Sequence, residues 1–156
     1  MELRTIVRID RSPFRISYDD PVMFVGSCFA SSLVMKMKAG KMPVSINPSG
    51  TVYNPVSVMN TLELVLSERK YSVEDISSYE GRWFSYGHYT DFTSHDPQEL
   101  LGRINAKTGE AAAFLAGSAC LFITFGTARV YTSKETGNIV SNCHRIPADR
   151  FTDRML

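Results

Sequence analysis

Three observations predict an α/β fold with a parallel sheet. Residues 22–25 form a short apolar run, the length expected of a buried strand. A glycine turn then leads into residues 28–38, where apolar side chains recur at helical spacing. The same order of strand, glycine loop and helix returns over residues 44–46 and 55–66. Strands that alternate with helices in this way are typical of a parallel sheet.

The ends of both helices carry the expected signals. Ser27 stands where a helix N-cap residue is favoured, and Gly40 is a suitable stop. Lys36 and Lys38 sit near the carboxyl end of the first helix, where cations suit the helix dipole. Pro55 can open the second helix, because proline is favoured at the first helical position.

The other elements follow from the same patterns. We expect residues 3–9 to form a strand or an ordered arm, 98–115 a helix, 119–125 a strand, 129–132 and 139–141 a hairpin, and 147–156 a helix. The aromatic segment 79–95 predicts core packing or a dimer contact more than stacking on a base or sugar. Its two histidines, His88 and His95, are expected on the surface, and Cys120 in the core.

Composition limits the class of protein. The 156 residues fit one domain over 1–156, and the net charge of +1 gives no sign of a nucleic-acid partner. No apolar run reaches the roughly 20 residues that span a bilayer, and the N-terminus lacks the features of a secretory signal, so we expect a cytoplasmic protein. Three cysteines argue against a disulfide framework. The sequence stops inside an expected helix, which predicts a truncated domain.

Cys28 is the strongest candidate for chemistry. It follows a buried strand and a glycine, and it lies in the first turn of a helix. Unpaired backbone N–H groups and the helix dipole stabilise an anion at this end of a helix, including a thiolate nucleophile. The competing interpretation is a small buried cysteine that only fits tight packing between strand and helix.

Three neighbouring candidates also have ordinary structural explanations. Ser27 is a second candidate nucleophile, although serine most often only caps a helix. Gly50 could give its N–H to an oxyanion, or it could simply occupy a turn that needs positive φ. Asn54, before Pro55, is a substrate-binding candidate and equally a turn residue.

A second constellation lies at residues 141–145. His144 could act as a general base, Asn142 as an oxyanion donor and Arg145 as an anion clamp. In a strand, Asn142 and His144 would share one face and Cys143 would lie on the other. The alternative is a polar strand end with a buried Cys143.

The sequence indicates no cofactor and no metal. Its cysteines and histidines lack the close paired spacing of a structural zinc site. Gly26 is not followed by the Gly-x-x-Gly of a dinucleotide fingerprint, and no Walker phosphate loop is present.

The pentapeptide Gly26-Ser-Cys-Phe-Ala30 resembles the motif that gives the GSCFA family its name. Residues 47–55, 124–128 and 142–144 are similar to later blocks of that family, in the same order. The family is related to the SGNH/GDSL hydrolases. The resemblance therefore implies a three-layer α/β/α fold with a mainly parallel central sheet, similar to SGNH and flavodoxin-like proteins, and here incomplete.

The resemblance also implies roles for individual residues. Cys28 falls on the nucleophile position, where the larger superfamily has serine, and Gly50 falls on the glycine that donates its N–H to the oxyanion. The Asn expected in the third block is Ala128, for which Asn142 is a conjectured replacement. The usual C-terminal Asp-x-x-His pair is absent from residues 1–156, leaving His144 as the internal candidate base.

The leading hypothesis is an SGNH-like acyl hydrolase or acyltransferase that acts on an ester or acetyl group of a small molecule or carbohydrate. The alternative is a non-catalytic binding or assembly domain that retains the fold. A third interpretation is a redox-sensing thiol at Cys28 or Cys143. Uncovered apolar surface on an incomplete sheet would also favour a homo-oligomer.

Overall fold

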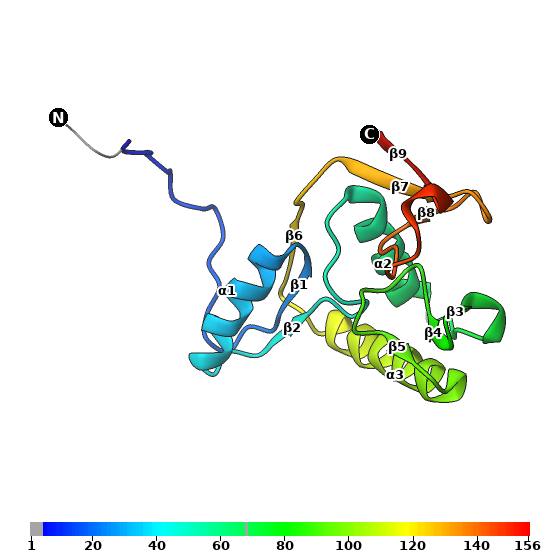
Figure 1. Cartoon of the computed structure of the whole chain (residues 1–156). Coiled ribbons are helices and arrows are strands. Elements are labelled where there is room, and N and C mark those ends of the chain that lie inside the picture. Colours follow the sequence, from blue (N-terminus) through cyan, green and yellow to red (C-terminus); the bar gives the residue numbers. More distant parts are fainter. Residues whose placement is uncertain (1–4, 68) are drawn as a thin grey trace.

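The computed structural model describes residues 5–67 and 69–156 (Figure 1). Its central feature is a three-stranded parallel sheet in the order β2-β1-β6, formed by Val44–Ile46, Val22–Gly26 and Cys120–Thr124. Val22 pairs with Val44 on one side and with Cys120 on the other. The two strand–loop–helix units predicted from the sequence are therefore confirmed, and they share one sheet.

Helices cover both faces of this sheet. Helix α1 (Cys28–Ala39) packs on the face that carries Val22 and Phe24, where Ala30 and Val34 are buried. Helices α2 (Pro55–Ser67) and α3 (Pro97–Ala116) cover the face that carries Met23 and Val25. All five residues of β1 are buried. This explains why the strand reads as a continuous apolar run rather than an alternating one.

Two small antiparallel sheets complete the structure. One has the order β3-β4-β5, from Ser77–Tyr79, Arg82–Phe84 and Thr93–Ser94. The other has the order β8-β7-β9, from Ile139–Val140, Arg129–Ser133 and Phe151–Met155. Short 3₁₀ turns at Val73–Asp75 and Ala148–Arg150 precede β3 and β9.

The predicted helix over 147–156 is wrong. Residues 151–155 form β9, which pairs with β7 along its whole length, from Arg129↔Met155 to Ser133↔Phe151. The apolar residues of this short segment fit the spacing of a helix as well as that of a strand. Pairing with β7, which is distant in the sequence, makes it a strand. An ion pair between Arg129 and Asp153 joins the two strands.

Three further expectations need correction. His88 is only 1% exposed and lies in the core, because it packs on Tyr71 and Phe92, whereas His95 is exposed as predicted. Residues 5–9 form no strand and are exposed, and Leu3 and Arg4 lie outside the described residues. Ser27 occupies the N-cap of α1, but its side chain makes no capping hydrogen bond.

The aromatic middle segment contributes to a second core, as expected. Phe92 joins Leu100, Leu101 and Ile104 of α3, with Trp83 packed against them. Cys120 is half-buried and packs against the cluster between β1 and α1. Within the residues that the structure describes, no helix combines the length and apolar character needed to traverse a membrane.

Candidate functional site

The candidate site lies where β1, β2 and β6 end, at one edge of the parallel sheet. Gly26 ends β1 with φ at +143°, and its N–H donates to Oδ1 of Asn47, after β2, at 2.7 Å. A Cβ at Gly26 would lie 2.0 Å from the carbonyl oxygen of Thr124 in β6. Only glycine allows these three strand ends to approach so closely. Ligands of parallel α/β sheets bind at this edge.

Cys28 and Ser27 differ sharply in exposure at this edge. Cys28, the first residue of α1, is exposed, which contradicts the interpretation of a buried packing cysteine. Ser27 is buried, and its backbone N–H donates to the carbonyl and the hydroxyl of Thr124 at 3.2 and 2.9 Å. Its own hydroxyl lies 3.0 Å from the Thr124 hydroxyl. Ser27 therefore joins β1 to β6, and Cys28 is the thiol that a solute can reach.

The first backbone amides of α1 lie at the same helix end as Cys28. The first N–H groups of a helix have no partner inside the helix, and the Ser27 side chain does not cap them. The N–H of Ala30 donates to the carbonyl of Ser27 at 3.0 Å. The amides of Cys28 and Phe29 are thus placed to bind an anion beside the thiol.

Two tyrosines that the sequence analysis missed stand beside Cys28. A Cβ at Gly126, after β6, would meet Cδ1 of Tyr53 at 2.9 Å and Cβ of Ser27 at 3.4 Å. The carbonyl of Tyr53 accepts the N–H of Gly126 at 2.8 Å. Burial raises the pKa of Tyr53, and the neighbouring Tyr89 hydroxyl and Cys28 thiol raise it further. Tyr53 therefore keeps its phenolic proton at neutral pH.

Gly50 is explained by Tyr89. Its φ is +78°, and a Cβ there would lie 2.4 Å from Cβ of Tyr89. The Tyr89 N–H donates to the carbonyl of Ser49 at 2.8 Å, so the two loops are joined through their backbones. The N–H of Gly50 itself donates to the carbonyl of Asn47 at 2.8 Å within the turn. Asn54 is buried, and its Oδ1 accepts the N–H of Ser57 at 2.9 Å at the start of α2.

The second constellation forms a turn instead of a strand. β8 ends at Val140, and His144 and Arg145 both have positive φ, 50° and 63°. The expected alternation of Asn142 and His144 against Cys143 is therefore wrong, because such dihedrals reverse the chain. The Oδ1 atom of Asn142 accepts the N–H of His144 at 2.7 Å, which stabilises the turn. Arg145 is exposed, and Cys143 is half-buried.

His144 is directed at the segment 85–90. Its Nε2 lies 2.8 Å from the carbonyl oxygen of Ser85 and 3.1 Å from that of His88. Because both partners are acceptors, Nε2 carries the proton in the neutral ring. Nδ1 is then the basic atom, and it is buried with no hydrogen-bond partner among the described residues. Within those residues no hydrogen bond joins His144 to Cys28.

The pKa values of both His88 and His144 are lowered, mainly by burial. Burial, and then the nearby His144, lower the pKa of His88 to about 4. Its Nδ1 lies 2.9 Å from the Ser85 hydroxyl. Burial also lowers the pKa of His144, although its hydrogen bonds to the two carbonyls act in the opposite direction. Both rings are therefore neutral at pH 7.

The segment Ser85–Thr90, absent from the predictions, links both candidate clusters. Tyr89 packs on Gly50 and influences Tyr53, beside Cys28. Thr90 Oγ1 accepts a hydrogen bond from Nδ2 of Asn142 at 3.2 Å. The structure thus brings the 142–144 turn against one side of this segment and the Cys28 edge against the other.

The sequence placed this segment inside the aromatic stretch 79–95 but could not show its partners, since its contacts with Gly50, Tyr53 and the 142–144 turn join residues far apart in the chain. The sequence did offer a signal for Tyr53, because this residue lies inside the block 47–55 that resembles the family. Among the described residues, no group of three or more His, Cys, Asp or Glu side chains is arranged to hold a metal ion.

The sequence model of the GSCFA family matches residues 21–156. The chain belongs to the GSCFA family. The match covers every strand and helix described above and begins just before β1. No curated protein and no solved structure matches the chain. The GSCFA pentapeptide itself spans the end of β1, the exposed Cys28 and the first turn of α1.

Proposed function

We propose that this GSCFA domain is an acyl hydrolase or acyltransferase in which Cys28 is the nucleophile. The observation that carries the proposal is the exposed Cys28 thiol at the start of α1, at the carboxyl edge of the parallel sheet. The chain's membership of a family defined by this pentapeptide supports it. The relation to the SGNH hydrolases, and with it a three-layer fold, belongs to the same proposal.

The reaction proceeds in two steps. The Cys28 thiolate attacks the carbonyl carbon of an ester, a C–S bond forms, and the C–O bond breaks as the alcohol leaves with a proton. Water or a second hydroxyl then attacks the thioester, transfers its proton to solvent and releases the thiolate. Because Cys28 is exposed, water can take up and return the protons of both steps at this thiol.

The negative charge that develops on the carbonyl oxygen requires hydrogen-bond donors. We assign this role to the amides of Cys28 and Phe29 and to the Tyr53 hydroxyl, which stays protonated for the reasons given above. The amides of Gly50 and Asn142, expected from the resemblance to fill it, donate instead to Asn47 and Thr90. Tyr53 is thus the side-chain donor that this proposal assigns to the oxyanion.

The alternative is a non-catalytic binding domain. One observation favours it: His144, the internal candidate base, directs Nε2 to the carbonyls of Ser85 and His88. In that case Cys28 would be reactive but would turn over no ester. Substrates within the first proposal are small-molecule or carbohydrate esters, with Arg145 as an exposed anion-binding residue beside the 142–144 turn.

The test combines alkylation with hydrolysis of p-nitrophenyl acetate by the full chain. Cys143 is half-buried and burial raises its pKa, so the exposed Cys28 should be alkylated faster than Cys143 at the same pH, as read by peptide mass spectrometry. Cys28→Ala should reduce ester hydrolysis about 100-fold or more, whereas the matched control Cys143→Ala should keep it. Tyr53→Phe should lower kcat about 10- to 100-fold and leave alkylation of Cys28 unchanged.

The outcomes separate the hypotheses. Alkylated Cys28 with no hydrolysis in the wild type supports the binding domain. Hydrolysis that survives in Cys28→Ala rejects the nucleophile. Hydrolysis that Cys28→Ala abolishes and Tyr53→Phe leaves intact rejects only the role given to Tyr53.

A further inference from the structure

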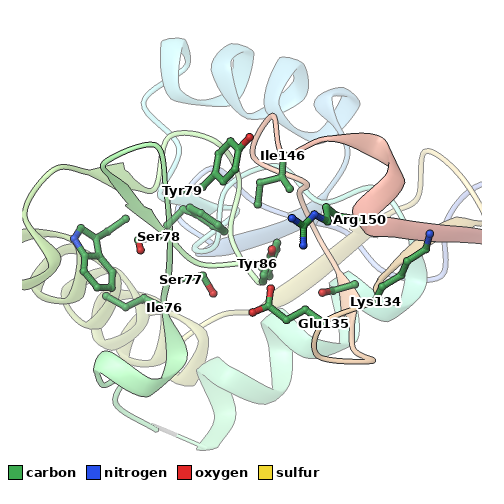
Figure 2. A pocket seen from close by; sticks show the side chains of 12 residues that line it. Ile76, Ser77, Ser78, Tyr79, Tyr86, Lys134, Glu135, Ile146 and Arg150 are labelled. Carbon is green, nitrogen blue, oxygen red and sulfur yellow. The ribbon is translucent and has the colours of Figure 1, made fainter.

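A cavity of about 790 Å³ opens on the side of the molecule formed by the two antiparallel sheets (Figure 2). Its lining comes from three parts of the chain: residues 76–86 around β3 and β4, residues 133–135 in the β7–β8 turn, and residues 146–150 before β9. None of these residues belongs to the loops around Cys28. The volume falls within the range of about 300–1,000 Å³ that small-molecule sites occupy.

The centre of the cavity is polar and carries both signs of charge. Figure 2 shows the Tyr86 hydroxyl near the middle, with the Glu135 carboxylate and the Arg150 guanidinium directed toward it. Burial raises the pKa of Tyr86, Glu135 raises it further, and Arg150 lowers it, so both charged groups act on this one hydroxyl. None of the three ion pairs within the described residues includes Glu135 or Arg150.

Lys134 provides a contrast within the same lining. Its Nζ donates to the carbonyl oxygen of Asp149 at 2.7 Å and points away from the centre in Figure 2. The lysine is therefore engaged in holding the turn, whereas Arg150 and Glu135 are left to face a solute. The wall beside Arg150 includes Ile146 and Tyr79, whereas Ile76 lies across the cavity from the charged groups (Figure 2).

We propose that this cavity binds an α-amino acid with a large apolar side chain. Its carboxylate would pair with Arg150, its ammonium group with Glu135, and its side chain would lie against Ile146 and Tyr79. A guanidinium presents parallel donors that match a carboxylate. The Tyr86 hydroxyl, between the two charged groups, donates to the same carboxylate.

The charge pattern excludes the simpler ligand classes. A simple anion would be attracted by Arg150 and repelled by Glu135. A simple cation would be attracted by Glu135 and repelled by Arg150. A neutral sugar would remove water from both charged groups without replacing it by an opposite charge, which is costly. A zwitterion neutralises both groups in one step and places its apolar part against the apolar wall.

The binding assay uses the fluorescence of Trp83, which is the single tryptophan of the chain and lines the cavity. Titration of the full chain with L-phenylalanine, excited where phenylalanine does not absorb, should give a saturable change. N-acetyl-L-phenylalanine, which lacks the ammonium charge, and L-phenylalaninamide, which lacks the carboxylate, should each bind about tenfold or more weakly. Glucose should give no change.

Two variants assign the two ends of the ligand. Arg150→Gln should weaken phenylalanine about tenfold and remove the preference over the amide. Glu135→Gln should weaken it similarly and remove the preference over the N-acetyl compound. Arg154→Gln, which removes one exposed charge of β9 outside the lining, is the matched control and should bind as the wild type does.

Each possible result decides the matter. Loss of discrimination in the expected pairs establishes the site and its orientation. No saturable signal at millimolar phenylalanine, equal binding of the three compounds, or unchanged binding in both variants overturns the proposal. A response to glucose that exceeds the response to phenylalanine assigns the cavity to a neutral polyol and also overturns it.

Discussion

His88 and His144 show how single residues depend on the whole fold for their protonation state. His88 lies in the segment 85–90 and His144 packs against it, and burial outweighs the two carbonyl hydrogen bonds that would favour a charged His144. Burial makes the charged form unfavourable, and each ring would repel a charge on the other. Two histidines that the sequence places outside any helix or strand thus become part of the packed interior.

Acid should therefore destabilise the protein through these residues. The pKa of His88 falls from 6.5 in the unfolded chain to about 4 in the fold, so the unfolded state binds the proton more readily. Stability should be fully present above about pH 6.5 and decline as the pH falls toward 4, by on the order of 3 kcal/mol for His88. Urea unfolding across this pH range measures it.

Two variants identify the source of that acid sensitivity. His88→Gln should flatten the decline between pH 6.5 and 4, even if it lowers stability at neutral pH. His95→Gln removes an exposed histidine and should leave the decline unchanged. An identical pH slope in the His88 variant would show that other groups are responsible.

Two glycines should respond in opposite ways to substitution by alanine. Gly50→Ala should destabilise by at least about 1–2 kcal/mol, because φ is +78° and the new Cβ would collide with Tyr89. Gly102→Ala in α3 meets nothing within 4 Å and should stabilise by about 0.5–1 kcal/mol. Thermal or denaturant unfolding of both variants provides the comparison. Equal effects would mean that the Gly50–Tyr89 contact contributes nothing.

At the scale of elements, local patterns identified most of the structure correctly. The spans of α1, α2, α3 and the three parallel strands agree with prediction to within one or two residues. In these elements apolar residues recur at regular spacing, and a glycine, a proline or a capping residue marks a boundary. The segment 151–155 failed because its neighbours in space, not its own sequence, favour a strand. The turn at 141–146 failed similarly, since its dihedrals depend on contacts with residues 85–90.

Strand β6 leaves one edge of the parallel sheet open. It pairs with β1 alone among the described strands, and Leu121, Ile123 and Phe125 are partly exposed along it, Ile123 to 43%. Open apolar edges pair with other chains. We expect self-association that grows with protein concentration, as light scattering would detect.

A charge on this edge should reduce the association. Ile123→Lys places an ammonium group on β6, whereas Leu66→Lys places the same group on the exposed side of α2 as a control. The first variant should scatter as a monomer at concentrations where the second still associates. A monomeric wild type at high concentration would contradict the expectation.

For the whole molecule, the sequence predicted an α/β fold with a parallel sheet and singled out Cys28, but it left the exposure of Cys28 open and missed what surrounds that residue. The strand–loop–helix repeat and the GSCFA pentapeptide are local signals, and both are found where expected. Tyr53, Tyr89 and the segment 85–90 come together only through long-range packing. The same applies to the cavity around Tyr86, whose lining is drawn from three distant parts of the chain.

The segment Ser85–Thr90 has a consequence for how this family can vary. The 142–144 turn binds it at Ser85, His88 and Thr90, and Gly50 packs against Tyr89 between them. An added residue lengthens an extended chain by about 3.3 Å, more than a hydrogen bond tolerates. We therefore expect an inserted or deleted residue in this segment to disturb the candidate site more than a side-chain change that keeps these contacts.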